Sequence, residues 1–278
     1  MGLDFVGVGS LGIDIIKTEN AVFKTPGGSA VNTAAALQKL GLKTGVIGRV
    51  GKDEYGRSIL EGLKNLGVDT RRVIIDENLP TTRCYIDVQN GESKVVNLEY
   101  LSRLYTFRDE DKKYLKSAKS IIIGPRLPIF EQYALFAKEN NITTYVTLHM
   151  SVLDKKIISI LNEIKPKAIF ANEKEASSLD EMITPETTIV VTKGNEGCSV
   201  ITSNGSESFP SFKVKPIDPT GAGDSFSAGY IYGDVKKWAL KKKLTFANAL
   251  GALATQQVGA RSRLYSLEEI ENFIKNKN

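Results

Sequence analysis

The chain has 278 residues, 41% of them hydrophobic, so it is long enough to bury a large core as one α/β domain, and its composition does not indicate disorder. Lys and Arg number 37 against 32 Asp and Glu, and this net charge of +5 suits small anionic ligands without requiring nucleic acid. The two cysteines form no disulfide or metal pattern, and neither a leader nor a transmembrane run is present, so we expect a cytoplasmic protein without a membrane or nucleic-acid partner.

Short apolar runs alternate with helical stretches along the chain. This pattern predicts strands at residues 3–9, 44–47, 120–123, 144–148, 168–171 and 189–192, and helices at 29–40, 56–66, 130–139 and 154–164. Such alternation predicts an α/β fold with a mainly parallel central sheet that helices cover on both faces. In folds of this class, ligands bind at the carboxyl ends of the strands.

Two segments break the alternation. Residues 83–89 and 92–98 are strand-like and flank Asn90-Gly91, a strong β-hairpin signal, and residues 13–25 are strand-like as well. We interpret them as a small β-lid, from about residues 13–26 and 82–99, inserted in a single domain of residues 1–278. A lid over a strand-end cleft excludes water; an ordinary edge hairpin fits the pattern about equally well.

Polar residues near the first strand suit a ligand with several hydroxyl groups. Gly27 and Gly28 precede a predicted helix whose first turn contains Asn32, which offers both a donor and an acceptor. The structural alternative is a turn with Ser29 as the helix N-cap. Asp14, after the first strand, could hold a pair of hydroxyl groups, although a lone acid there is more often solvated.

Two later strands also lead into polar side chains. Asn172 follows the strand at 168–171, and Glu175 comes three residues later. Their oxygens could hold a hydrated Mg²⁺ near the phosphates of a nucleotide, or could form a helix capping box. After the strand at 189–192, Lys193 precedes a turn with Gly194 and Gly197, where the lysine is available to a phosphate; the alternative is a plain β-turn.

The most informative segment is residues 218–229, DPTGAGDSFSAG, a glycine turn that opens a helix. Gly221 and Gly223 let backbone N–H groups converge at the positive end of the helix, which favours an anion such as phosphate. A carboxylate at Asp224 repels that anion unless it has its own task, such as accepting a proton from an attacking hydroxyl. The pattern therefore indicates phosphoryl transfer to an alcohol, and an ordinary first-turn acid is the alternative.

Other enzyme classes fit less well. Residues 7–12 match the dinucleotide fingerprint, but the β-branched residues at 13–16 follow where a helix is required. A Walker A motif is absent. His149 is the only histidine, which disfavours a histidine metal site or a Ser-His-Asp triad, and we interpret it as structural or as a substrate contact.

Taken together and in this order, these motifs resemble the ribokinase (phosphofructokinase B) family over essentially the whole chain. The resemblance implies a three-layer α/β/α domain with a β-lid that transfers the γ-phosphoryl group of ATP to a hydroxyl. It implies that Asp224 is the catalytic base and that the amides of Gly221, Ala222 and Gly223 form an anion hole.

The resemblance also implies roles for the other motifs. Acceptor contacts fall on Asp14, Gly28 and Asn32, and the residues that organise Mg²⁺ through water are Asn172 and Glu175. The nucleotide side falls on Lys193, Gly194 and Gly197, with Asn248 as a wall of the adenine pocket.

Three departures from the family pattern bear on the substrate and on regulation. Arg126 stands where ribokinases tend to carry an acid that touches the sugar, which indicates an anionic group on the acceptor or a different hydroxyl pattern. The segment between Asp14 and Gly27 is short, which leaves both a monomer and a lid-mediated homodimer open. Residues 259–263 resemble the monovalent-cation loop only loosely, so potassium activation is also open.

We therefore expect an ATP- and Mg²⁺-dependent kinase for a small sugar, sugar acid or inositol-like polyol. A nucleoside (adenosine-like) kinase is the alternative, which an aromatic platform for the base would favour. A non-catalytic carbohydrate or nucleotide binder on the same fold would bind without turnover, and the intact Asp224 motif disfavours it.

Overall fold

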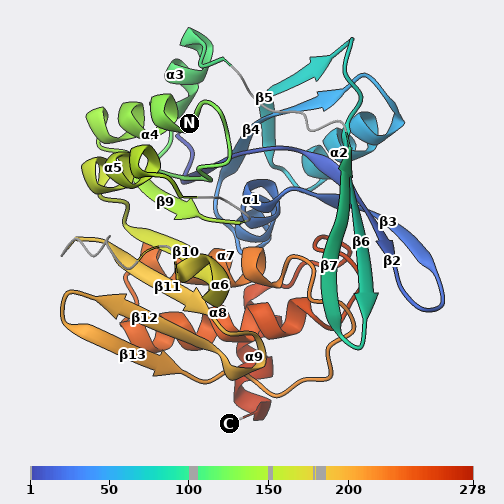
Figure 1. The fold of residues 1–278 in the computed structure, drawn as a ribbon, viewed down its shortest axis with the longest axis vertical. Helices are drawn as coiled ribbons and strands as arrows, with labels where there is room; N and C mark the ends of the chain where they lie inside the picture. Colours follow the sequence, from blue (N-terminus) through green and yellow to red (C-terminus); the bar gives the residue numbers. More distant parts are fainter. Residues whose placement is uncertain (1, 100–105, 150–152, 178, 180–185, 278) are drawn as a thin grey trace.

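A nine-stranded sheet forms the centre of the part of the chain that the computed structural model describes, which is all but residues 1, 100–105, 150–152, 178, 180–185 and 278 (Figure 1). Its order is β13-β12-β11-β10-β9-β8-β1-β4-β5. The strands are β1 (Phe5–Val8), β4 (Thr44–Gly51), β5 (Asp69–Asp76), β8 (Ser120–Ile123), β9 (Thr143–Thr147), β10 (Ala168–Asn172), β11 (Thr188–Thr192), β12 (Cys198–Thr202) and β13 (Gly205–Phe209). Only the pairings of β12 with β11 and β13 are antiparallel among these, so the predicted mainly parallel sheet is confirmed.

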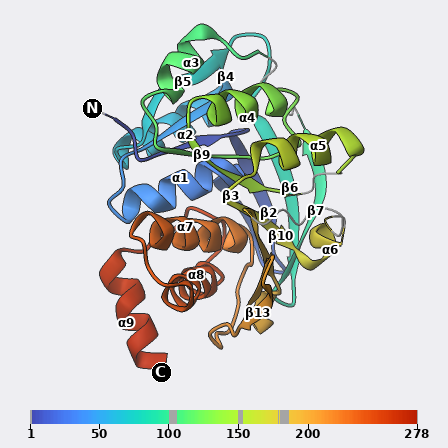
Figure 2. The same ribbon diagram turned by 90° about the vertical axis from the view of Figure 1, so that its left-hand side faces the viewer.

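Helices cover both faces of this sheet, which gives three layers (Figure 2). The helices are α1 (Ser29–Lys39), α2 (Glu54–Asn65), α3 (Asp109–Leu115), α4 (Phe130–Glu139), α5 (Lys155–Ile164), α6 (Glu173–Ala176), α7 (Ala222–Val235), α8 (Leu240–Ala254) and α9 (Leu267–Lys277). On β8, Ile122 packs in the core beneath α1, α7 and α8, whereas Ile121 and Ile123 pack in the core beneath α4 and α5. Successive strand side chains point to opposite faces, so a sheet buried on both sides needs continuous apolar runs.

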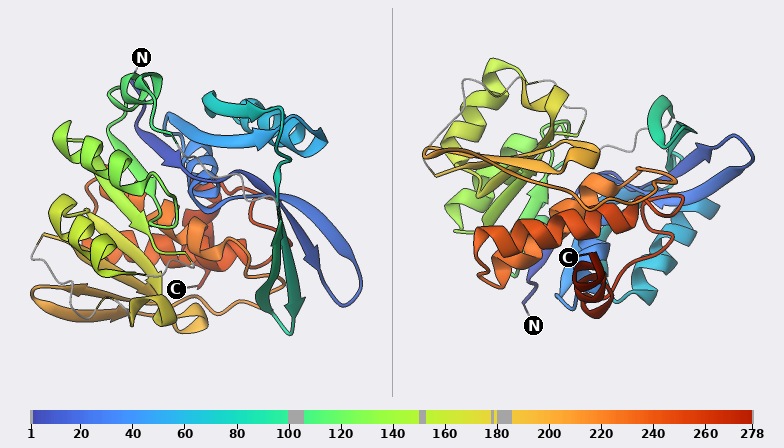
Figure 3. Two further views of the ribbon diagram at one scale, coloured as in Figure 1. Left: turned by 45° about the horizontal axis from the view of Figure 1, so that its top comes forward. Right: turned by 90° about the horizontal axis from the view of Figure 1, so that it is seen from below.

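A second sheet, of order β3-β2-β6-β7, stands at one side of the molecule (Figure 3). Its strands are β2 (Gly12–Lys17), β3 (Val22–Gly27), β6 (Thr82–Gln89) and β7 (Glu92–Glu99). The β6–β7 turn has positive φ angles of 53° at Asn90 and 77° at Gly91, as the Asn-Gly signal predicts. The strand-like stretch at 13–25 divides into β2 and β3, which pair antiparallel. We call this four-stranded sheet the lid sheet.

Residues 48–56, which include three glycines, join β4 to α2. Strand β4 runs on to Gly51, and α2 begins at Glu54, before the predicted start at residue 56. Asp53 is the N-cap: its Oδ1 accepts hydrogen bonds from the Gly56 amide at 2.8 Å and from the Thr81 hydroxyl at 2.6 Å. Asp53 therefore caps α2 locally and also ties the start of the helix to Thr81, 28 positions away.

Candidate active site

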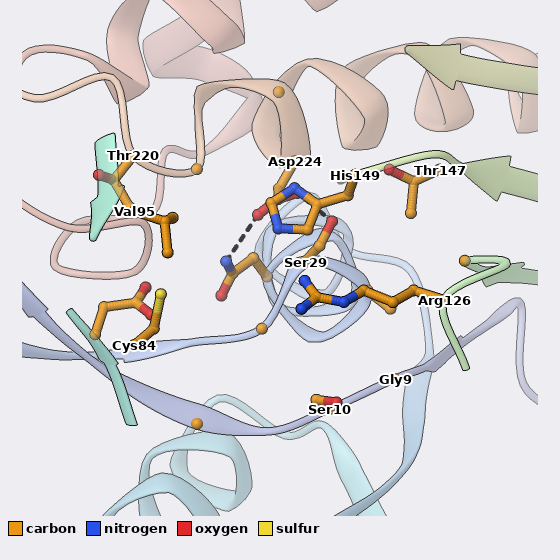
Figure 4. Close-up of a pocket in the computed structure, with 18 of the residues that line it drawn as sticks. Gly9, Ser10, Ser29, Cys84, Val95, Arg126, Thr147, His149, Thr220 and Asp224 are labelled. Carbon is orange, nitrogen blue, oxygen red and sulfur yellow. Dashed lines mark hydrogen bonds between the residues drawn. The ribbon is translucent and has the colours of Figure 1, made fainter. Parts of the chain in front are cut away.

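A cavity of about 630 Å³ opens where β1, β8, β9 and β10 end, and the lid sheet forms one of its walls (Figure 4). The residues that matter most below reach it from distant parts of the chain: Ser10, Asp14, Asn32, Cys84, Arg126, His149, Asn172, Glu175, Gly221, Gly223 and Asp224. The carboxyl ends of parallel strands meet at one edge of the sheet, so the cavity lies where the fold class predicts.

Asp224 lies in the first turn of α7 and is held by side chains from α1. Its Oδ1 accepts a hydrogen bond of 2.5 Å from the Ser29 hydroxyl, and its Oδ2 accepts one of 2.8 Å from the Asn32 amide. Each carboxylate oxygen therefore has one donor and keeps a further lone pair for a hydroxyl in the cavity. The two donors fix the plane of the carboxylate before any ligand arrives.

The first turn of α1 differs from the simplest sequence interpretation. Ser29 is not the N-cap, because Gly28 takes that position with φ 114°, and the Ser29 hydroxyl turns to Asp224 instead. A Cβ on Gly28 would stand 2.2 Å from the Ser10 carbonyl oxygen. Glycine is thus required at position 28 both by the backbone angle and by the close approach of the chain after β1.

Asp14, on β2, is a buried carboxylate with only 7% of the residue exposed. A Cβ on Gly27 would meet both of its carboxylate oxygens at 2.3 Å, so the missing side chain makes room for this acid. Burial raises the pKa of Asp14 to about 7, and the nearby Asp224 and Asp218 add to the rise, whereas the Arg261 guanidinium opposes it. Asp14 therefore changes charge near neutral pH.

Arg261 is a site residue that the motifs did not single out. Its Nε donates to the Pro26 carbonyl at 3.4 Å and its Nη2 to the Gly27 carbonyl at 3.3 Å. Loss of hydration lowers its pKa to about 10, while the charges of Asp14 and Asp224 oppose that shift. The only sequence signal was the loose resemblance of residues 259–263 to a cation-binding loop. Here a guanidinium supplies positive charge beside the two carboxylates.

Asp218 joins this C-terminal loop to the start of α7. The side chain is fully buried, and its Oδ1 accepts from the Thr220 amide at 2.9 Å and from the Thr220 hydroxyl at 2.6 Å. Its Oδ2 accepts from the Gly259 amide at 2.8 Å. One carboxylate thus fixes the glycine turn and the loop that carries Arg261, and this explains the acid at the start of the 218–229 motif.

The N-terminus of α7 presents backbone donors to the cavity. The N–H groups of Gly221, Gly223 and Asp224 donate to no residue within the described parts of the chain. The amide of Ala222 differs: it donates to the Pro219 carbonyl at 3.0 Å, so the expected set of three amides does not include a free Ala222. A Cβ on Gly223 would meet no atom within 4 Å, so the space in front of these donors is open.

Asn172 and Glu175 both line the cavity and form the capping box that was the structural alternative. The Asn172 amide donates to Glu175 Oε2 at 3.0 Å, and the Glu175 amide donates to Asn172 Oδ1 at 2.8 Å. Capping does not exhaust the lone pairs of these oxygens. No group of three or more His, Cys, Asp or Glu in the described chain could ligate a metal directly, so these two oxygen donors suit a hydrated ion.

The residues expected on the nucleotide side gather elsewhere, and none of them lines the described cavity. A Cβ on Gly197 would stand 2.1 Å from the Phe209 carbonyl oxygen, and the Asn248 amide donates to the Pro210 carbonyl at 3.1 Å. Asn248 is buried there, while Lys193 and Gly194 form the turn after β11 with the short 3₁₀ helix η1 (Gly194–Glu196). Asn248 and Gly197 therefore hold the segment after β13, and contact with a nucleotide stays a prediction for all four residues.

Comparison with known proteins settles the family. The model for pfkB family carbohydrate kinases matches residues 8–266. The chain belongs to the pfkB family. This kinase is 27% identical to 5-dehydro-2-deoxygluconokinase from Clostridium beijerinckii, over 98% of the chain and 93% of that protein. It is 31% identical to ATP-dependent ribose-1-phosphate kinase from Halopiger xanaduensis, over 85% of the chain and 82% of that protein.

The fold of this pfkB kinase also matches solved structures. Burkholderia thailandensis nucleoside kinase in complex with inosine superposes with a TM-score of 0.86, over 98% of each chain at 19% identity. The sequence prediction of a ribokinase-family α/β kinase is therefore confirmed in family, fold and general activity: the protein is an ATP-dependent carbohydrate kinase. None of its described helices is long and apolar enough to cross a membrane.

Proposed function

We propose that this pfkB kinase phosphorylates a hydroxyl of a small sugar, sugar acid or polyol, with Asp224 as the general base. One observation carries the proposal: Asp224 and the unpaired N–H groups of Gly221 and Gly223 belong to the same helical turn and face the same cavity. A base and an anion site this close can act in one in-line displacement, the base on the attacking hydroxyl and the anion site on the transferring phosphoryl group.

The part of the cavity proposed to bind the phosphoryl acceptor contains side-chain oxygens that can accept hydrogen bonds from substrate hydroxyl groups. The Nδ2 atom of Asn32 donates a hydrogen bond to Asp224, so the Oδ1 atom of Asn32 points away from that carboxylate. This oxygen is buried and has no hydrogen-bond partner in the described chain. An unpaired buried acceptor costs about 1 to 3 kcal/mol, which a substrate hydroxyl would recover by donating to it. Asp14 lines the same cavity, so the two side chains together suit a pair of hydroxyl groups on the substrate.

In the proposed reaction, Asp14 and Asn32 orient the acceptor so that a further hydroxyl donates to Asp224. Asp224 takes the hydroxyl proton as the oxygen attacks the γ-phosphorus of ATP, and the bond to the β-phosphate oxygen breaks. The N–H groups at the start of α7 stabilise the charge on the transferring group. Asn172 and Glu175 would hold Mg²⁺ through water, and the ion supplies neutralisation of phosphate charge when it is bound.

The names of the relatives bear on the acceptor class. Two of them name an acid sugar and a sugar phosphate, and the superposed nucleoside kinase at 19% identity supports the fold alone. An aromatic platform for the base would favour a nucleoside acceptor, and the described residues that line the cavity include no Phe, Tyr or Trp. A sugar or polyol is therefore the better proposal.

The test is ATP consumption against hexoses, pentoses, sugar acids, inositols and nucleosides, with Asp224→Asn assayed in parallel. We expect turnover of one acceptor class and a loss of 10² to 10⁴-fold in kcat in the variant, with ATP affinity retained. Near-normal turnover by Asp224→Asn would exclude the assigned base, and ATP binding without turnover of any acceptor would favour a binding protein.

A further inference from the structure

Three basic side chains line the cavity. Arg126 follows β8, His149 follows β9, and Lys94 belongs to β7 of the lid sheet, and all three line the cavity. In Figure 4 the Arg126 guanidinium and the His149 imidazole reach into the cavity on opposite sides of Ser29. These three donors come from separate elements, so their presence in one cavity is a property of the fold and not of a local charge run.

Arg126 lies on the acceptor side of the site. Strand β8, which leads to Arg126, is the neighbour of β1, whose continuation carries Asp14; β10, which leads to Asn172 and Glu175, is two strands away. Cys84 is the register partner of Asp14 in the lid sheet. The pKa of its thiol is raised to about 12 by burial and by Asp14, and the charge of Arg126 opposes the rise. Arg126 therefore acts at the same place as Asp14.

The two carboxylates of the cavity give these basic side chains a reason to be there. Asp14 and Asp224 face one cavity, so together they repel any acceptor that carries a negative charge. A neutral sugar meets no such repulsion and needs no basic groups. The guanidinium, ammonium and imidazole that line the same cavity provide the donors that an anionic acceptor requires.

Resting on the kinase function above, we propose that the acceptor carries an anionic group, a carboxylate or a phosphate, which binds Arg126 with help from His149 and Lys94. The same acceptor places its hydroxyl groups at Asp14 and Asn32. A guanidinium can donate two hydrogen bonds to two oxygens of either anion, so Arg126 selects for negative charge. The size of the space around Arg126 then decides between a carboxylate and a phosphate.

The experiment compares matched acceptors that differ in the anion. D-Gluconate is paired with D-glucose, and fructose 6-phosphate with fructose, so the two arms separate carboxylate from phosphate. The variants are Arg126→Gln and Arg126→Glu, with Arg83→Gln as the control, because Arg83 lies over the Tyr55 ring at 5.5 Å and does not line the cavity. We expect the anionic member of at least one pair to have the higher kcat/KM in the wild type.

In Arg126→Gln this preference should fall roughly 10- to 100-fold, mainly through KM, and in Arg126→Glu it should invert, while Arg83→Gln should leave it unchanged. Binding of the same four compounds to Asp224→Asn and to Asp224→Asn/Arg126→Gln, measured by calorimetry, gives a readout without turnover. Neutral acceptors preferred in both pairs, or an anion preference untouched by Arg126→Gln, would overturn the inference. Turnover of the neutral members that depends on Asp224 would then leave the kinase proposal intact, so the two failures are distinguishable.

Discussion

The Asn32 amide donates a hydrogen bond of 2.8 Å to the Asp224 carboxylate across 192 positions of sequence. This contact joins the first turn of α1 to the first turn of α7, so the group proposed to bind the acceptor and the proposed base are oriented by each other. Ser29 reaches the other oxygen of the same carboxylate. Removing either partner tests different parts of this arrangement.

Asn32→Ala should impair the enzyme more than Ser29→Ala. Both variants remove a donor to Asp224, but only Asn32→Ala also removes the buried Oδ1 proposed to accept from the substrate. We expect Ser29→Ala to reduce kcat with little change in acceptor KM, and Asn32→Ala to reduce kcat and raise KM, each by about tenfold or more. Steady-state kinetics on the preferred acceptor decide this, and equal KM values in the two variants would remove Asn32 from the acceptor site.

Gly223→Ala should separate stability from activity. The added Cβ meets no atom within 4 Å, and alanine favours a helix over glycine by about 1 kcal/mol, so the melting temperature should rise. The methyl group also enters the space in front of the α7 amides, so we expect kcat to fall about tenfold or more. Gly62→Ala in α2 is the matched control, because its Cβ also meets nothing: it should stabilise the fold and leave kcat unchanged.

Gly27→Ala should reproduce the effect of removing Asp14. The new Cβ would overlap both Asp14 carboxylate oxygens at 2.3 Å, so the acid must leave its position. We expect a rise in acceptor KM of about tenfold or more in Gly27→Ala and in Asp14→Ala, with ATP affinity kept in both. The double variant should be no worse than the single ones, because both act on the same contact. Additive losses would show that Gly27 acts independently of Asp14.

Asp14 should make acceptor binding depend on pH. Its pKa of about 7 means that the carboxylate ionises as the pH rises from 6 to 8, and the ionised form accepts hydroxyl hydrogen bonds more strongly. For a neutral acceptor, KM should therefore fall over this range, and the change should disappear in Asp14→Asn. A KM that does not vary with pH in the wild type would contradict the assignment.

Stability should follow the same ionisation with the opposite sign. The pKa of Asp14 is raised above its ordinary value of 3.8, so the folded state retains a proton there that the unfolded chain has lost. This contribution is complete below pH 4 and is lost as the pH rises to about 7. Asp14→Asn should thus gain stability over the wild type between pH 5 and pH 8, by on the order of 2 kcal/mol. Denaturation of Asp109→Asn, which changes an exposed acid, should show no such trend.

Local patterns predicted the parts of this fold that depend on local physics. Residues 121–123 and 189–191 are apolar at every position because β8 and β11 are buried on both faces there, and Asn90-Gly91 predicts its own turn. Strand β5 was not predicted, because it lies at the edge of the sheet and is only half-buried, which removes the apolar contrast. The division of residues 13–25 into two strands also escaped local analysis.

The site was predicted where a motif contains its own chemistry, and was missed where distant residues create it. The turn from Gly221 to Asp224 contains both the proposed anion site and the proposed base within four residues. Arg261 has no comparable signal, because its importance depends on carbonyls of Pro26 and Gly27, more than 230 positions away. Glycine patterns were ambiguous in the same way: Gly197 and Gly223 look alike in sequence, but the first is packed against a carbonyl and the second faces open space.

Helix α1 lies in the apolar core with α7, and its residues from Ala30 to Leu37 are all buried. During synthesis the ribosome delivers α1 almost 200 residues before α7, so for most of translation this apolar helix has no cover on that side. A chain that ends before α7 lacks Asp224, the α7 amides and Arg261 together, and so holds Asp14 with neither the proposed base nor the proposed anion site. We therefore expect the chain to become active only after α7 has been made and has packed on α1.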